Sequence, residues 1–220
     1  MTQLETELQL LKDEVKNMWS LVQAQLEKAK IALWNFDKDL AREVIVKERR
    51  VNAYELKIDR DCEDIFALYT PVAIDLRFLL AVLKINTNLE RTGDIAEGIA
   101  KYVLSAEKPF TPELLRITRV TEMYDEAVKM FSDTLIAFEK EDTILARSVF
   151  KKDEFLDQIN INANQFILEF LKEFPGEANE SLYALSIIRK LERIGDQSKN
   201  IAEEIIFYVE AKVLKHSHKL

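Results

Sequence analysis

The chain carries one six-residue motif twice, and this repeat constrains the fold more than any other feature. Residues 89–94 read Leu-Glu-Arg-Thr-Gly-Asp, and residues 191–196, which begin 102 positions later (191 minus 89), read Leu-Glu-Arg-Ile-Gly-Asp. Both copies lie in long proline-free segments with helical periodicity, so each places its glutamate and aspartate at i and i+4 on one helix face. A glycine inside a helix costs about 1 kcal/mol relative to alanine. Its presence in both copies indicates a face that another group approaches closely.

The spacing of apolar residues predicts long helices throughout the chain. Steps of three and four residues from Leu4 to Phe36 are typical of a helical-bundle seam. Asp37 and Thr111 are expected N-caps, Pro112 suits the first turn of a helix, and Pro71 ends the helix before it. The expected helices cover residues 3–36, 38–69, 73–104, 111–139, 142–174 and 177–214.

The repeat extends beyond the motif and defines the expected architecture. Residues 40–44 (Leu-Ala-Arg-Glu-Val) resemble residues 145–149 (Leu-Ala-Arg-Ser-Val) at an offset of 105. A repeat of this length, with three helices in each unit, predicts an all-α fold of two tandem three-helix bundles related by internal pseudo-symmetry. The expected domains are residues 1–107 and 111–214, followed by a tail at 215–220.

Composition argues against several classes of function. The net charge of -8 disfavours nucleic-acid binding, which needs a basic surface. The single cysteine, Cys62, excludes an internal disulfide and suits a reducing compartment. No signal peptide and no apolar run of about 18 residues is present, so no transmembrane segment is expected. Because neither His216 nor His218 follows a glutamate by three residues, a di-iron Glu-x-x-His site is disfavoured, and no catalytic residue is assigned.

Carboxylates recur at matching positions and are candidate cation ligands. The offset of 105 brings Glu48 and Asn52 into register with Asp153 and Asp157, on helices that can pack against the two motifs. Carboxylate oxygens suit Mg²⁺, Ca²⁺, Mn²⁺ and iron. An alternative is that these faces are simply solvated. Asn52 is not a carboxylate, so the first site is expected to be the weaker one. The candidate metal ligands are Glu48, Asn52, Glu90, Asp94, Asp153, Asp157, Glu192 and Asp196.

The duplicated motif resembles the PhoU family of phosphate-signalling proteins. Residues 71–77 (Pro-Val-Ala-Ile-Asp-Leu-Arg) and residues 51–59 also follow the family pattern, as do residues 200–203 (Asn-Ile-Ala-Glu). The sequence departs from that pattern at Gly98 and Lys101, where the family often has asparagine and glutamate. The resemblance spans about residues 3–214 and implies a fold of two similar three-helix bundles.

The resemblance also implies a function. Such a protein would be a negative regulator of the phosphate-starvation response. It would act in the cytoplasm, at the inner face of the membrane, as a non-catalytic adaptor between the ATPase subunit of a phosphate ABC importer and a membrane sensor histidine kinase. It would form a homodimer and carry a multinuclear site for iron, zinc, manganese, magnesium or nickel on the eight residues named above. The alternatives are a metal-dependent hydrolase of phosphate esters and a helical scaffold whose acids only solvate the surface.

Overall fold

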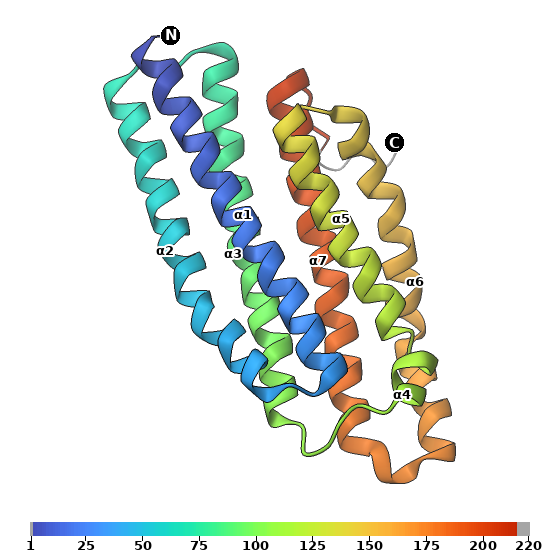
Figure 1. The fold of residues 1–220 in the computed structure, drawn as a ribbon. Coiled ribbons are helices and arrows are strands. Elements are labelled where there is room, and N and C mark those ends of the chain that lie inside the picture. Colours follow the sequence, from blue (N-terminus) through green and yellow to red (C-terminus); the bar gives the residue numbers. More distant parts are fainter. Residues whose placement is uncertain (1, 215–220) are drawn as a thin grey trace.

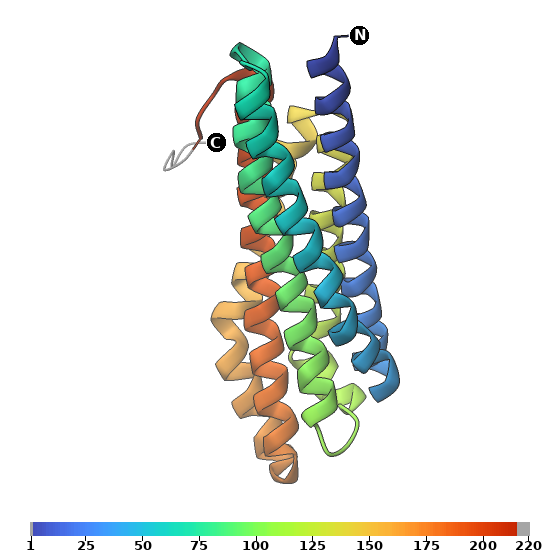
Figure 2. The same ribbon diagram turned by 90° about the vertical axis from the view of Figure 1, so that its left-hand side faces the viewer.

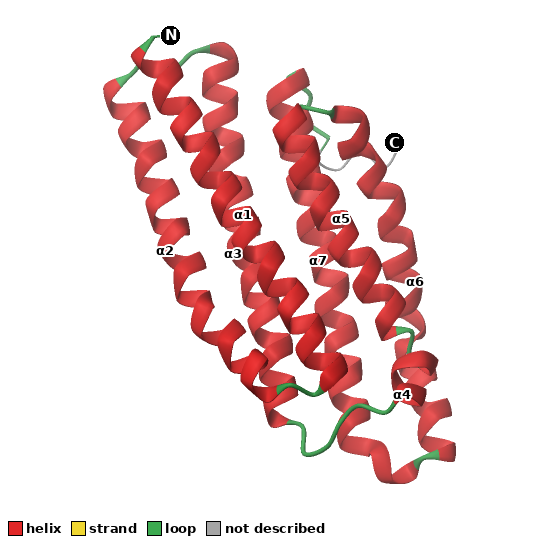
Figure 3. Cartoon of the chain, in the orientation of Figure 1, coloured by secondary structure: helices red, strands yellow, loops and turns green. Residues whose placement is uncertain are grey.

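The structure is a computed structural model that describes residues 2–214, and helices dominate this part of the chain (Figure 3). It contains no strand within those residues, which confirms the all-α fold class. In chain order the helices are α1 (Gln3–Asn35), α2 (Lys38–Leu68), α3 (Ala73–Ser105), α4 (Pro112–Ile117), α5 (Val120–Lys140), α6 (Thr143–Glu173), the 3₁₀ turn η1 (Pro175–Glu177) and α7 (Ala178–Glu210). None of the helices in residues 2–214 has the length and hydrophobicity needed to cross a membrane.

The helices form two three-helix bundles that lie side by side (Figure 1). Helices α1, α2 and α3 pack together in the first bundle, and α5, α6 and α7 in the second. The view turned by 90° shows that both bundles run along the same long direction (Figure 2). The bundles meet mainly through α3 and α7, the two helices that carry the repeated motif, and also where α1 contacts α5.

Several helix starts follow from local side-chain chemistry, and the N-caps expected at Asp37 and Thr111 are confirmed. The carboxylate of Asp37 accepts hydrogen bonds from the backbone N–H groups at the start of α2, and Asp142 does the same for α6. The Thr111 hydroxyl caps α4, with Pro112 as its first residue. Helix α2 ends at Leu68, shortly before Pro71.

Two expected helix bounds were wrong. The helix expected over residues 111–139 is interrupted, because Arg119 adopts a left-handed backbone with φ of 58° between α4 and α5. Its guanidinium lies over the Phe155 ring at 5.1 Å and pairs with Glu122, and these contacts offset the unfavourable backbone. The last helix ends at Glu210 rather than residue 214, because Ala211 is also left-handed with φ of 58°. The predicted tail, residues 215–220, lies outside the described residues, and the domain bounds stay a prediction.

One aromatic cluster joins the cores of the two bundles. Trp19 of α1 is fully buried, and its ring centroid lies 5.9 Å from that of Phe131 and 5.4 Å from that of Phe138, both on α5. The Tyr124 hydroxyl of α5 donates a hydrogen bond of 2.8 Å to the carbonyl oxygen of Leu26 on α1. The hydrophobic core is therefore continuous between the bundles.

We expect Trp19→Ala to lower the free energy of unfolding by about 3–5 kcal/mol, because it leaves a cavity in this shared core. Urea denaturation followed by circular dichroism should show a single transition, since both bundles lose the same contacts. Trp19→Phe is the matched control. It keeps an aromatic ring and removes an indole N–H that has no hydrogen-bond partner, so it should cost about 1–2 kcal/mol. Two separate transitions would show that the bundles unfold independently.

Candidate functional site

Each motif glycine gives room to a buried carboxylate of the neighbouring helix. A β-carbon on Gly93 would lie 3.0 Å from both carboxylate oxygens of Glu48, on α2. A β-carbon on Gly195 would lie 2.7 Å from Oδ1 of Asp153, on α6. Glu48 is 4% exposed and Asp153 is 5% exposed. The close approach expected from the sequence is thus confirmed, and the approaching group is an acid in both bundles.

The buried carboxylate of the first bundle has no hydrogen-bond partner. Neither oxygen of Glu48 accepts a hydrogen bond of normal geometry from a described residue, and the nearby Gln25 amide lowers the pKa of Glu48 by less than burial raises it. Burial raises the pKa of Glu48 to about 7, and repulsion from Asp94, Glu97 and Glu90 adds to the effect. Burial and the neighbouring Asp94 also raise the pKa of Glu90. This face therefore concentrates negative charge around a desolvated acid, and a bound cation would relieve the repulsion.

In the second bundle a lysine ammonium, rather than a metal ion, supplies the positive charge beside the buried acid. The Lys199 ammonium pairs with Asp153 and, at 2.9 Å, with Oδ1 of Asp196. Burial opposes the charge on Lys199, but its hydrogen bonds to the two aspartates outweigh burial and raise its pKa. Lys199 corresponds to Glu97 of the first bundle (199 minus 102). The same position thus bears opposite charges in the two units.

The structure brings most of the expected ligands close to one another. In the first bundle Glu90 and Asp94 lie close enough to Glu48 to raise its pKa, whereas Asn52 is exposed. In the second bundle Asp153, Asp157 and Asp196 lie close enough to Glu192 to raise its pKa. Within residues 2–214, however, no group of three or more His, Cys, Asp or Glu side chains is arranged to hold a metal ion. Their role as metal ligands therefore stays a prediction.

The donor set fits a cation better in the first bundle than in the second. Glu48 offers two unpartnered carboxylate oxygens beside Glu90 and Asp94, whereas Asp153 and Asp196 already share the Lys199 ammonium. The expected ranking, which rested on Asn52 and counted only acids, stays a prediction, and these contacts favour the opposite order. Sequence reasoning missed Lys199 because a ligand search disregards basic residues. Applying the offset of 102 to Glu97 would have found it.

We expect removal of one charge to have opposite effects on the free energy of unfolding in the two bundles. Because the pKa of Glu48 rises from 4.5 to about 7, its environment favours folding most below pH 4.5, and that contribution is lost as pH rises through 7. With a chelator present, Glu48→Gln should therefore raise the free energy of unfolding by about 1–2 kcal/mol at pH 8 and change it little at pH 4.5, after allowance for screening.

The matched variant in the second bundle is Lys199→Met. It should lower the free energy of unfolding by about 2 kcal/mol at pH 8, because it leaves Asp153 buried without its cation. The measurement for both variants is urea denaturation across pH 4.5–8. Destabilisation by Glu48→Gln at pH 8 would contradict the reading of the first bundle as a site of uncompensated charge.

Comparison with known proteins places this geometry in a family. The PhoU domain matches residues 15–103 and 120–205, which lie within the two bundles. A PhoU homolog of Aquifex aeolicus is 35% identical over 213 residues, covering 96% of this chain and 95% of that protein. The phosphate-specific transport system accessory protein PhoU of Escherichia coli is 32% identical over 214 residues, covering 97% of this chain and 88% of that protein.

Solved structures agree with the sequence matches. The crystal structure of PhoU from Pseudomonas aeruginosa superposes with a TM-score of 0.90 at 31% identity, covering 96% of this chain and 100% of that chain. The phosphate transport system regulatory protein PhoU from Streptococcus pneumoniae gives a TM-score of 0.86 at 30% identity, covering 96% of this chain and 99% of that chain. The chain therefore belongs to the PhoU family.

Proposed function

We propose that the chain regulates phosphate uptake as a non-catalytic adaptor in the cytoplasm. It would bind the ATPase subunit of a phosphate ABC importer and a membrane sensor histidine kinase, and so restrain the phosphate-starvation response. Relatives that match over nearly their whole length are named as accessory proteins of a phosphate-specific transport system. These names favour the regulatory role over metal-dependent hydrolysis of phosphate esters.

The observation that carries this proposal is an apolar surface at one end of the first bundle. Around the α2–α3 connection, Leu68 is 73% exposed and Val72 is 63% exposed, and Ile74 is exposed beside them. The same end holds a groove of about 450 Å³ between α1 and α2, with Leu10 and Leu68 among its lining residues. Exposed apolar patches of this kind are typical of interaction sites.

Charge around the groove indicates the chemistry of the partner. Its rim carries four carboxylates and one ammonium: Glu7, Glu14, Asp61, Asp64 and Lys57. An apolar groove with an acidic rim suits an amphipathic helix that has basic residues on its polar face. We propose that the importer's ATPase subunit presents such a segment, with the bundle approaching from the cytoplasmic side of the membrane.

We expect substitution of Val72 and Ile74 by aspartate to weaken binding to the purified ATPase subunit at least tenfold, which is about 1.4 kcal/mol. Ile161→Asp is the control, because Ile161 is equally apolar and 71% exposed but lies on α6 of the second bundle. Biolayer interferometry gives both affinities, and circular dichroism checks folding. Unchanged binding by the folded double variant would place the docking site elsewhere.

We also propose that the first acidic face binds a divalent cation. Glu48, Glu90 and Asp94 would hold it, and the ion would neutralise the charge that raises the pKa of Glu48. Manganese, iron, magnesium, zinc and nickel all remain candidates from the donor set. Self-association into a homodimer is a further proposal, which light scattering after gel filtration tests directly.

Mn²⁺ titration of chelator-treated protein by calorimetry tests the metal site. We expect Asp94→Ala to weaken Mn²⁺ binding at least tenfold, whereas Asp196→Ala should have little effect because Lys199 already neutralises that side chain. Lys199→Met should add binding capacity in the second bundle, because it frees Asp153 and Asp196. A greater loss with Asp196→Ala than with Asp94→Ala would contradict the assignment to the first bundle.

A further inference from the structure

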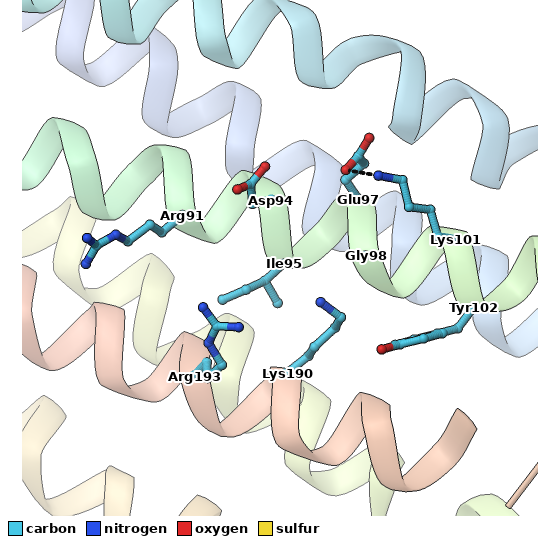
Figure 4. Close-up of a pocket in the computed structure, with 9 residues that line it drawn as sticks. All are labelled: Arg91, Asp94, Ile95, Glu97, Gly98, Lys101, Tyr102, Lys190 and Arg193. Carbon is cyan, nitrogen blue, oxygen red and sulfur yellow. Dashed lines mark hydrogen bonds and ion pairs between the residues drawn. The ribbon is translucent and has the colours of Figure 1, made fainter. Parts of the chain in front are cut away.

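A cationic pocket lies where α3 and α7 pack against each other, at the junction of the two bundles (Figure 4). It encloses about 360 Å³. Four of its lining side chains are basic (Arg91, Lys101, Lys190 and Arg193), and two are acidic (Asp94 and Glu97), which gives a net charge of +2 (4 minus 2). This is a local excess of positive charge in a chain whose net charge is -8.

Most of this positive charge is not neutralised within the protein. Among residues 2–214, Arg91, Lys190 and Arg193 form no ion pair, while Lys101 pairs with Glu97 at 2.5 Å. The Lys190 ammonium lies over the Tyr102 ring, 5.7 Å from its centroid. Burial and the nearby Arg193 lower the pKa of Lys190. In Figure 4 the carboxylates of Asp94 and Glu97 point away from Lys190, and the side chain of Ile95 lies between the two helices beside Lys190 and Arg193.

The internal repeat supplies a comparison for this pocket. A second hollow of about 460 Å³ lies on the same α3–α7 junction, and the offset of 102 relates five of its eight lining residues to residues that line the first. Asn88 and Asn200 there correspond to Lys190 and Gly98, and Asn200 donates a hydrogen bond of 3.3 Å to Asn88. Its lysine, Lys84, is paired with Glu204 at 2.9 Å. The repeat therefore does not by itself produce a cationic pocket. Only one of the two equivalent hollows has an excess of basic side chains.

Gly98 is what allows Lys190 to lie in the pocket. A β-carbon at position 98 would overlap the Lys190 ammonium and lie 2.6 Å from Cε of the same side chain. The asparagine found at the equivalent position 200 would therefore displace Lys190. A glycine inside a helix costs about 1 kcal/mol relative to alanine, and here it keeps open the space that the lysine occupies.

We infer that this pocket binds a small phosphate dianion, either inorganic phosphate or the phosphate group of a small ester. Arginine presents paired N–H donors that match phosphate oxygens, and lysine adds a compact charge. The volume lies at the small end of the range for ligand pockets. The choice of phosphate among oxyanions rests on the proposed function.

Such a ligand would connect the two bundles. Lys190 and Arg193 would hold the anion from α7, and Gly98 of α3 lies directly against the Lys190 side chain. Arg91 also lines the pocket from α3, but in Figure 4 its guanidinium points away from these two cations. Binding would then stabilise the α3–α7 contact without involving the apolar end of the first bundle.

Calorimetric titration of the purified full chain in phosphate-free buffer tests the inference. The probes are inorganic phosphate, glycerol phosphate and sulfate. We expect phosphate binding that Lys190→Asn weakens at least tenfold, while Lys84→Asn, the control in the equivalent hollow, leaves it unchanged. Preference for inorganic phosphate or for the ester identifies the source of the group, and either one supports the site. Absent binding, binding that does not depend on Lys190, or equal binding of sulfate would overturn the inference.

A second variant separates binding from folding. Gly98→Ala should stabilise α3 through higher helix propensity, yet weaken phosphate binding because the new methyl group displaces Lys190. Affinity for the importer's ATPase subunit is measured on the same samples. A chain that docks but does not bind phosphate overturns only this inference, and a chain that binds phosphate but does not dock overturns only the adaptor role.

Discussion

The contact between a buried carboxylate and a motif glycine determines how each bundle is built. Glu48 reaches Gly93, and Asp153 reaches Gly195, at distances that leave little or no room for any side chain on the glycine. A buried ionised acid is unfavourable unless a positive group compensates it. The two bundles meet this requirement differently. The first has a carboxylate with a strongly raised pKa, and the second has the Lys199 ammonium between two aspartates.

The same divergence continues along the junction of the two bundles. Glu97 and Lys199 occupy equivalent positions and have opposite charges, and Lys101 and Glu203 do so as well. These exchanges place negative charge on the face of the first bundle and positive charge in the adjoining pocket. The pseudo-symmetry of the backbone therefore does not extend to the chemistry of the surface.

Local signals made much of the fold predictable from the sequence. Asp37 and Thr111 cap their helices through bonds to backbone groups two or three residues away, so the sequence alone identifies them. Asp142 caps α6 in the same way, although it was expected only as the start of a helix. The break at Arg119 was not predictable, since a left-handed backbone is uncommon at arginine and no glycine or proline marks the position. The carboxylates were found through their spacing, which a helix converts directly into a shared face.

The charges that oppose those carboxylates were not found, because their positions depend on tertiary packing. Lys199 was overlooked in a search for acidic ligands. The relation of Gly98 to Lys190 depends on the register between α3 and α7, and spacing within a single helix says nothing about it. Periodicity gives the faces of helices, whereas the partner of each face becomes visible only after the helices are docked.

Helix α3 links the apolar end of the first bundle to the junction between bundles. It begins at Ala73, beside the exposed Val72, and reaches Arg91 after 18 residues (91 minus 73), a length of about 27 Å at 1.5 Å per residue. A ligand held between α3 and α7 stabilises that contact by about 2.7 kcal/mol when its concentration is 100 times its dissociation constant. If docking at the apolar end favours a different position of α3 relative to α7, the same free energy opposes docking. Docking then lowers the affinity for the ligand by an equal factor. The effect depends on a difference in affinity between the two positions, and a ligand that binds both equally would leave docking unchanged.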